Sequence, residues 1–361
     1  MWVLKKNYLV QILNYFLLDL ARPRNLLWFW NFGFMLGISI VIQVLRGFLL
    51  SLYYNDSVNY AFYSVRYLIL EVENGYEFRF IHSRGARLLF FLIFIHIGRG
   101  IWYKSYYLLE VWESGRLIFL ILIGVSFLGY VLPWGQISFW AATVITNLIY
   151  VIPYVGGSVL EWVWGGFRVG GPTLSRFFIL HYILPFVILV LRLVHLIFLH
   201  VNGRRNSPGV TSINDKVESH WFYLLKDIVS FLILILMFIL LLLLIPFVFM
   251  DSENFLFVDI IKTPEHIKPE WYFLFAYCIL RRVPNKLGGV IGLVIRIVIL
   301  ILLPLLTKNY FKFNDLIGSY IVRFHFVVFF MLTWLGGCVV EWPYRRLGGL
   351  IRILYFIIFF F

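Results

Sequence analysis

The stretch GYEFRFIHSRGARLLFFLIFIHIGRGIWYK, residues 75–104, decides the fold, because it places His82 and His96 in a run rich in Phe, Leu and Ile. The two histidines are 14 residues apart, which returns them to nearly the same face of a helix, about 21 Å apart along its axis. The stretch SRFFILHYILPFVILVLRLVHLIFL, residues 175–199, repeats this spacing with His181 and His195. Histidine is rare at membrane depth and needs a partner there. The matched pairs therefore predict two metal centres, each held by one histidine from each helix; four separately hydrogen-bonded histidines would leave the spacing unexplained.

The composition is that of a membrane protein. Of the 361 residues, 62% are hydrophobic and 14% charged, and the mean hydropathy is +0.89; soluble domains are far less apolar. The net charge of +13 favours anionic lipid headgroups over nucleic acid as partners. Residues 1–25 lack the layout of a signal peptide and resemble an amphipathic segment lying on the membrane surface. Cys278 and Cys338 form no CxxC motif and are not ligand candidates.

Apolar runs long enough to cross a bilayer occur about eight times, which predicts an all-α membrane protein with eight transmembrane helices. We expect a four-helix bundle over residues 1–203, which holds the metal centres, and the other helices over residues 204–361. The Lys and Arg counts of the two sides, 13 and 14, do not orient the chain. The second and fourth spans run parallel, so that His82 faces His181 and His96 faces His195. The predicted spans are Phe29–Leu52, Gly75–Tyr103, Arg116–Leu132, Leu174–His200, Ile228–Phe249, Leu287–Leu306, Leu316–Gly337 and Leu347–Phe361, the last being only 15 residues long.

Glycines on two other predicted helices repeat the spacing of the histidines. Gly33 and Gly47 are 14 residues apart, and so are Gly115 and Gly129. Glycine allows another body to approach a helix closely. Ordinary packing of small residues would explain one such pair, whereas two pairs at the histidine spacing favour a flat cofactor pressed against each glycine.

Arginines bracket the histidines at opposite ends of the second span. Arg79 lies one turn outside His82, and Arg99 lies one turn outside His96. Guanidinium groups at the two membrane faces suit the carboxylates of a porphyrin, although interfacial snorkelling would explain either arginine alone. The sequence therefore predicts two bis-histidine b-type haems in a haem-binding four-helix bundle. Because both axial positions are filled, such haems carry electrons and do not bind oxygen.

Three loops carry further candidate residues. Residues 129–147, GYVLPWGQISFWAATVITN, combine aromatic and small side chains without an acid or a base, and predict a surface helix lining an apolar pocket. Glu270, in TPEHIKPEWY (residues 263–272), stands at an aromatic rim, where a carboxylate can accept a proton from a hydroxyl; a solvated loop acid is the alternative. His200, Lys226 and Asp227 flank another loop and either exchange protons with a ligand or are simple interfacial residues.

Together these features closely resemble cytochrome b of the bc1 complex, also called respiratory complex III or ubiquinol–cytochrome c reductase. The resemblance covers essentially the whole chain. Plastid-type cytochrome b6 is a poorer match, because it ends after four helices and spaces the histidines of its fourth helix one residue further apart, whereas this chain continues through PEWY at residues 269–272. Other matching motifs are WNFG (30–33), HIGRG (96–100), FWAATVITN (139–147), RFF (176–178), HLIFLH (195–200) and YCILRRVPN (277–285).

The resemblance implies a transmembrane electron-transfer subunit of quinol–cytochrome c reductase, working by a Q cycle coupled to proton translocation. A low-potential haem would lie on His82 and His181, and a high-potential haem on His96 and His195. Ubiquinol would be oxidised at a positive-side site and ubiquinone reduced at a negative-side site, with both chain termini on the negative side. The resemblance assigns Glu270, Tyr272, Tyr277, Tyr130 and Ala141 to the first site, and Asn31, His200, Lys226 and Asp227 to the second.

The implied partners are the Rieske iron–sulfur protein, cytochrome c1 and accessory subunits of a homodimeric complex, together with an anionic lipid such as cardiolipin. The 38 Phe residues favour an AT-rich organelle gene and hence the mitochondrial inner membrane, with a bacterial plasma membrane as the alternative. A transporter or channel would share the spans and the buried charges but would not explain the four histidines.

Several residues depart from the family pattern. Ala141 stands where the family usually has glycine, and Arg204 replaces a small polar residue near the negative-side site. An unpaired arginine at mid-bilayer costs at least ~2.5–3.5 kcal/mol, so we expect each arginine inside a span to pair with an acid, a propionate, a lipid headgroup or another subunit. These arginines are Arg46, Arg192, Arg296 and Arg323.

Overall fold

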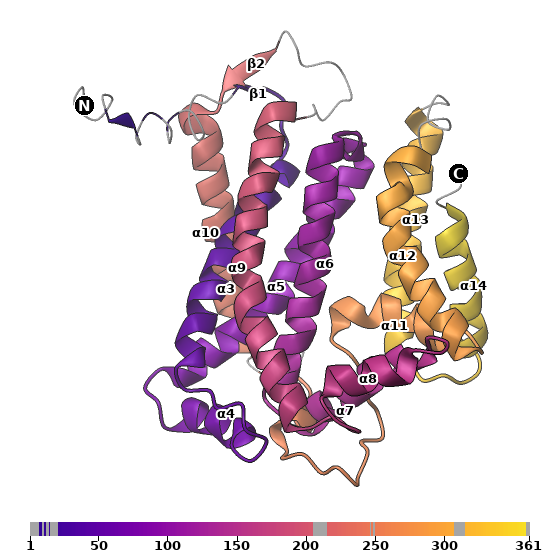
Figure 1. The fold of residues 1–361 in the computed structure, drawn as a ribbon. Helices are drawn as coiled ribbons and strands as arrows, with labels where there is room; N and C mark the ends of the chain where they lie inside the picture. The colour runs from indigo at the N-terminus through magenta and orange to yellow at the C-terminus, as the bar shows by residue number, and fades with distance from the viewer. Residues whose placement is uncertain are drawn as a thin grey trace. The chain divides into compact units, whose positions relative to one another are not determined.

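The computed structural model describes the chain except for residues 1–6, 9–10, 12–13, 15–20, 205–214, 246, 248–249, 307–314 and 359–361. The predicted amphipathic segment of residues 1–25 falls largely outside the described residues. Helices dominate the described part (Figure 1), which confirms the predicted all-α membrane fold. In the described part of the chain, one β-ribbon is formed by β1 (Ala21–Pro23) and β2 (Lys216–Glu218), which pair antiparallel with Arg22 opposite Val217.

Within the described residues, seven helices are long and apolar enough to cross a membrane. Four belong to the first half of the chain: α3 (Phe32–Ser51, preceded by the 3-10 turn η1, Trp28–Trp30), α5 (Gly75–Trp102), α6 (Leu109–Val131) and α9 (Gly171–Asn202). Three belong to the second half: α10 (His220–Leu244), α12 (Lys286–Leu306) and α13 (Asp315–Gly337). The eighth predicted span corresponds to α14 (Tyr344–Ile357), whose 14 residues extend only about 21 Å at helical rise.

Shorter helices connect the long ones. They are α4 (Ala61–Leu70), η2 (Ser105–Tyr107), α7 (Gln136–Thr146), η3 (Ile149–Val151), α8 (Gly156–Trp164), η4 (Ser252–Phe255), η5 (Trp271–Phe273) and α11 (Leu274–Arg281). The helix predicted within residues 129–147 is present as α7, but it is not a surface helix, because most of its residues are buried.

Helix boundaries differ most from the prediction at α10, which runs from His220 to Leu244 where residues Ile228–Phe249 were predicted. The next largest difference is at α6. This helix begins at Leu109, seven residues before the predicted start at Arg116. Its first turns carry Glu110 and Glu113, and Glu113 forms an ion pair with Arg116. A search for apolar runs finds only the part of a helix that lies in the hydrocarbon core of the membrane. Helical hydrogen bonding continues into the polar turns beyond it, where side chains three residues apart can pair.

The described chain forms two compact units. Unit 1 comprises residues 1–44, 84–119 and 187–248, and unit 2 comprises residues 45–83, 120–186 and 249–361. The helices α3, α5, α6 and α9 contribute residues to both units. As a result, His82 and His181 belong to unit 2, and His96 and His195 belong to unit 1.

Unit 2 has an apolar core around α7. Its buried members include Ala61, Val131, Ala142 and Leu174, each with no exposed surface. The side chain of Gln136, at the start of α7, binds the segment that follows α10. The Gln136 amide donates to Lys262 O at 2.5 Å and accepts from Asp259 N at 2.7 Å. The start of α7 therefore has a fixed partner more than a hundred residues further along the chain.

Candidate functional site

The first histidine pair lies in unit 2. The ring centres of His82 and His181 are 6.2 Å apart, and the rings are nearly perpendicular at 89°. Metal–imidazole bonds of about 2 Å, with each nitrogen about 1 Å from its ring centre, place two axial imidazoles about 6 Å apart. The observed separation therefore suits one metal ion between the two rings. The parity of the spans predicted this pairing and excluded the pairing of His82 with His195.

A hydrogen bond orients the ring of His181. Its Nδ1 lies 2.9 Å from the carbonyl oxygen of Val125 on α6. A carbonyl only accepts hydrogen bonds, so Nδ1 carries the proton and Nε2 keeps its lone pair. This is the arrangement found for metal-ligating histidines, whose second nitrogen donates to a backbone carbonyl or another acceptor.

The second pair lies in unit 1, where His96 and His195 are within electrostatic range of each other. Nδ1 of His195 lies 2.9 Å from Ser114 Oγ. That hydroxyl has a single proton, which it directs at the carbonyl oxygens of Glu110 and Val111, at 2.7 and 3.0 Å. Ser114 must therefore accept from His195, which again leaves Nε2 free to bind a metal.

His96 is the exception among the oriented histidines. Its Nδ1 lies 3.1 Å from Nη2 of Arg99, and a guanidinium can only donate. Nδ1 therefore accepts, and the proton sits on Nε2.

Each of the four glycines faces one histidine ring. A Cβ added at Gly47 or Gly115 would lie 3.0 Å from a ring atom of its histidine, and one added at Gly33 would lie 3.3 Å away. At Gly129 the added Cβ would be 2.8 Å from Nδ1 of His181. The prediction had a flat cofactor against each glycine; the neighbour within the chain is the imidazole. The pairs are Gly33 with His96, Gly47 with His82, Gly115 with His195 and Gly129 with His181.

The pairs offer two protein ligands each, and no group of three or more His, Cys, Asp or Glu side chains gathers at one point among the described residues. A porphyrin iron needs only two axial ligands, because the macrocycle supplies the others. The arginines predicted to bind the propionates lie near the histidines: Arg79 is within electrostatic range of His181, and Arg99 lies beside His96. The residues present therefore fit a b-type haem at each pair.

The predicted quinol-oxidation residues all lie in unit 2 but on separate segments. Tyr272 in η5 is buried, and Tyr277 in α11 donates to Ile267 O at 3.1 Å. Glu270, half-buried, precedes η5, and its carbonyl accepts from Phe273 N at 2.9 Å. Burial raises the pKa of Tyr277, with nearby Arg281 acting in the opposite direction, so its phenol stays neutral. Of the other two predicted residues, Ala141 in α7 is 4% exposed and Tyr130, near the end of α6, is half-buried.

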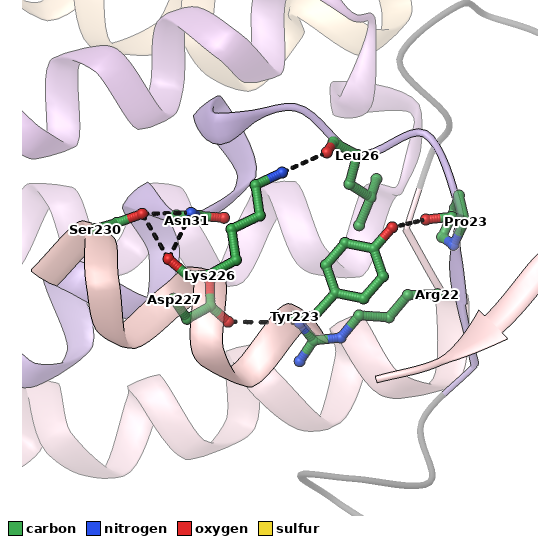
Figure 2. A network of polar contacts seen from close by, with 8 residues as sticks. All are labelled: Arg22, Pro23, Leu26, Asn31, Tyr223, Lys226, Asp227 and Ser230. Carbon is green, nitrogen blue, oxygen red and sulfur yellow. Dashed lines mark hydrogen bonds and ion pairs between the residues drawn. The ribbon is translucent and has the colours of Figure 1, made fainter. Parts of the chain in front are cut away.

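The predicted quinone-reduction residues come together in unit 1. The Asn31 amide donates to Ser230 Oγ at 2.6 Å and to the carbonyl of Lys226 at 3.2 Å (Figure 2). Nζ of Lys226 donates to Leu26 O at 2.7 Å, and Asp227 forms an ion pair with Arg22 at 3.5 Å. His200, in the last turn of α9, is within electrostatic range of Arg22.

Three residues of this network were not predicted. Tyr223 and Ser230 lie three or four residues from Lys226 and Asp227 on α10, so helical spacing would have revealed them as one polar face. Tyr223 Oη donates to the carbonyls of Pro23 and Arg24 at 2.8 and 2.7 Å. Arg22 is 205 residues from its partner Asp227, and no local pattern signals that contact.

Three of the four arginines inside the spans have aromatic partners that the prediction did not name, and Arg46 is also within electrostatic range of an acid, Glu77. Arg296, 7% exposed, lies 4.3 Å from the ring centre of Phe275. Arg46 lies 5.4 Å from the ring of Phe78, and Arg323 lies 5.6 Å from the ring of Tyr320. A cation over an aromatic face is stabilised by the ring quadrupole. The fourth, Arg192, packs against Gly37, where an added Cβ would lie 2.5 Å from its Nη2.

Sequence comparison agrees with this arrangement. Residues 17–203 match the family model described as cytochrome b/b6/petB, and residues 257–356 match the one described as cytochrome b (C-terminal)/b6/petD. The chain belongs to the cytochrome b family. A solved chain described as "Hyperthermophilic respiratory Complex III" is similar to this cytochrome b with a TM-score of 0.91 and 28% identity, over 99% of this chain and 96% of that one.

Membership of this family has direct consequences. The chain is a multi-pass transmembrane electron-transfer subunit, of the kind found in the bc1 complex, and it belongs to a multi-subunit redox complex. The family implies b-type haem and interaction with quinone. A transporter or channel without a redox role is excluded.

Proposed function

We propose that this cytochrome b holds two b-type haems, a low-potential haem between His82 and His181 and a high-potential haem between His96 and His195. The observation that carries the proposal is the pair of oriented imidazoles, His181 on Val125 O and His195 on Ser114 Oγ. Haem bound in this way supplies one-electron redox chemistry and no open position for oxygen. A visible spectrum of the purified complex tests it: a reduced α-band of bis-histidine haem is expected, with two components in a redox titration.

The chain's own residues would hold each haem by three means. Val125 and Ser114 fix the imidazole tautomer, the glycines leave space for the rings, and Arg79 and Arg99 bind the propionates. Transfer of Arg99 from His96 to a propionate would return His96 to its ligating tautomer. Binding of the carboxylate and binding of the iron at this site would therefore favour each other.

The proposed reaction is a Q cycle. At the positive-side site, quinol would give up two electrons and two protons. One electron would pass to the Rieske iron–sulfur protein and cytochrome c1, and the other would reach the negative-side site through the haems held by the two histidine pairs. At the negative-side site, quinone takes two electrons in successive turnovers and two protons. We assign Glu270 as proton acceptor at the first site, near Tyr272, Tyr277, Tyr130 and Ala141. Proton delivery at the second site is assigned to His200 and Asp227, with Asn31 and Lys226 as polar neighbours.

Replacing Glu270 by glutamine should lower the maximal rate of quinol oxidation more than it weakens quinol binding. Glutamine keeps the shape of the side chain and removes the base. The measurement is quinol–cytochrome c reduction over a range of quinol concentrations. Glu265→Gln, an exposed acid of the same loop, is the control. An unchanged maximal rate in Glu270→Gln would remove this residue from the proton path.

Replacing Ala141 by glycine should increase sensitivity to rigid methoxyacrylate-type inhibitors of the positive-side site. A methyl group in space that such a ligand fills costs ~1–3 kcal/mol by over-packing, which is roughly fivefold to over a hundredfold in affinity. Flexible quinol can avoid the methyl, so turnover should survive. Inhibition curves for quinol–cytochrome c reduction give the answer, with a negative-side inhibitor as control. Equal inhibition constants in the two proteins would show that residue 141 does not line the site.

The proposed partners are the Rieske protein, cytochrome c1 and accessory subunits in a homodimeric complex, with anionic lipid such as cardiolipin at its surface. For the membrane, two observations point in different directions. The 38 Phe residues favour an organelle gene and the mitochondrial inner membrane, whereas the hyperthermophilic complex favours a prokaryotic plasma membrane. Membrane fractionation of the native source would distinguish the mitochondrial inner membrane from a prokaryotic plasma membrane.

A further inference from the structure

The quinone-reduction cluster of unit 1 contains more positive than negative charge. Arg22, Arg204 and Lys226 surround a single carboxylate, Asp227. Arg99, on the His96 side, is also within electrostatic range of Arg204. Partly buried charges need compensation, because taking an ion out of water without a partner costs several kcal/mol.

The negative charge of Asp227 is already matched by Arg22. The two groups are 3.5 Å apart, and each side chain is only 10% exposed. The segment that carries Arg22 is fixed in place from α10, because Tyr223 donates to Pro23 O and Lys226 donates to Leu26 O (Figure 2). Lys226 thereby has a backbone acceptor for its ammonium group. Asp227 is therefore not available as the sole partner of a second guanidinium.

Arg204 is that second guanidinium. Its Nε is buried and has no hydrogen-bond partner among the described residues. Burial lowers its pKa to about 9, with Arg22 and Arg99 acting in the same direction and Asp227 against it. It remains cationic at neutral pH. The Arg204 side chain lies within electrostatic range of both His96 and His200.

We propose that Arg204 binds an oxyanion of a group that is held near His96 and His200. This proposal rests on the proposed function, which supplies two sources of such an oxyanion: a carboxylate of the haem on His96 and His195, or an oxygen of a reduced quinone. Arg204 would act as a specificity residue that this chain has in place of a small polar side chain. A guanidinium suits either source, because it offers paired N–H donors to an oxyanion.

Arg204→Gln in the intact complex tests the proposal, with Arg24→Gln as the matched control. Arg24 is an exposed arginine two residues from Arg22. Its substitution removes the same charge from the same region and leaves the side chains of the cluster, and the backbone contact of Tyr223 with Arg24 O, in place. The two readouts are the midpoint potential of the haem on His96 and His195, and the KM and kcat of quinone reduction. Arg204→Lys should recover part of any change, since it restores the charge without the paired donors.

Two results support the proposal, and each identifies the source. A lower midpoint potential with an unchanged KM assigns the haem carboxylate, because losing a cation disfavours the added electron. An unchanged potential with a several-fold rise in KM assigns the quinone oxygen. If neither quantity differs from Arg24→Gln, Arg204 binds no oxyanion and the proposal is wrong. Absence of any haem α-band in the unaltered complex would instead overturn the proposed function, and the KM comparison would still decide the role of Arg204.

Discussion

Replacing His181 by alanine is expected to abolish the haem between His82 and His181 and to leave the other haem partly assembled. The chain would lose one of the two imidazoles proposed to hold this haem, the one whose ring is oriented by Val125 O. His82→Ala should remove the same haem. Substitution of His96 or His195 should remove the other one. The measurement is the haem content per chain, together with redox-resolved difference spectra of the purified complexes.

His325 provides a matched control for this experiment. It lies on the membrane helix α13, with its ring 5.2 Å from that of Tyr355, and it belongs to neither pair. His325→Ala makes the same chemical change at membrane depth and should preserve both haem signals. The pairing would be refuted if loss of His82 eliminated the haem that is lost with His195.

The histidine pairing could be predicted because two simple regularities fix it. The 14-residue spacing places both histidines of a helix on one face, and the parity of the spans decides which histidines meet. The glycines were found by the same spacing, but their neighbours were not. The glycine spacing predicts where a neighbouring group can approach a helix backbone closely. The structure shows that this neighbouring group is a histidine ring of another helix.

The contacts that escaped prediction depend on distant segments or on hydrogen positions. Arg22 and Asp227 are brought together by a ribbon and the polar face of α10, and neither segment signals the other. Which nitrogen of His96 carries the proton follows from its contact with Arg99, and a residue spacing contains no such information. The ring of Tyr320 lies three residues before Arg323 on the same helix, and the ring of Phe78 lies on another helix than Arg46. The prediction considered only partners that would neutralise the charge of each arginine and therefore did not name these rings.

The anchoring of α7 is a further feature that sequence patterns do not reveal. Gln136 bonds both Asp259 and Lys262, and Trp140 Nε1 donates to Asp259 O at 3.2 Å. In the sequence, Gln136 is only one position of a local motif. In the structure, both its amide nitrogen and its amide oxygen form hydrogen bonds with a segment more than a hundred residues away. The helix that carries Ala141 is thereby held in a fixed position within unit 2.

Replacing Gly129 by valine should strongly reduce haem incorporation at the His82–His181 pair. Even the first carbon of the new side chain would lie 2.8 Å from Nδ1 and 3.0 Å from Nε2 of His181, closer than packed atoms normally approach. The ring must move, and its hydrogen bond to Val125 O must break or lengthen. Over-packing of this kind costs ~1–3 kcal/mol, and here the cost falls on a residue that binds the iron.

Gly124 lies on the same helix and supplies the control. A Cβ added there would meet nothing within 4 Å, so Gly124→Ala should retain both haems, whereas Gly129→Ala should already lose occupancy at one. The clearances also predict an order of severity for alanine: Gly129 first, then Gly47 and Gly115, then Gly33. Haem content measured separately for each site across this series tests the order. Full haem content in both Gly129→Val and Gly47→Val would mean that these glycines serve only the packing of one helix on another.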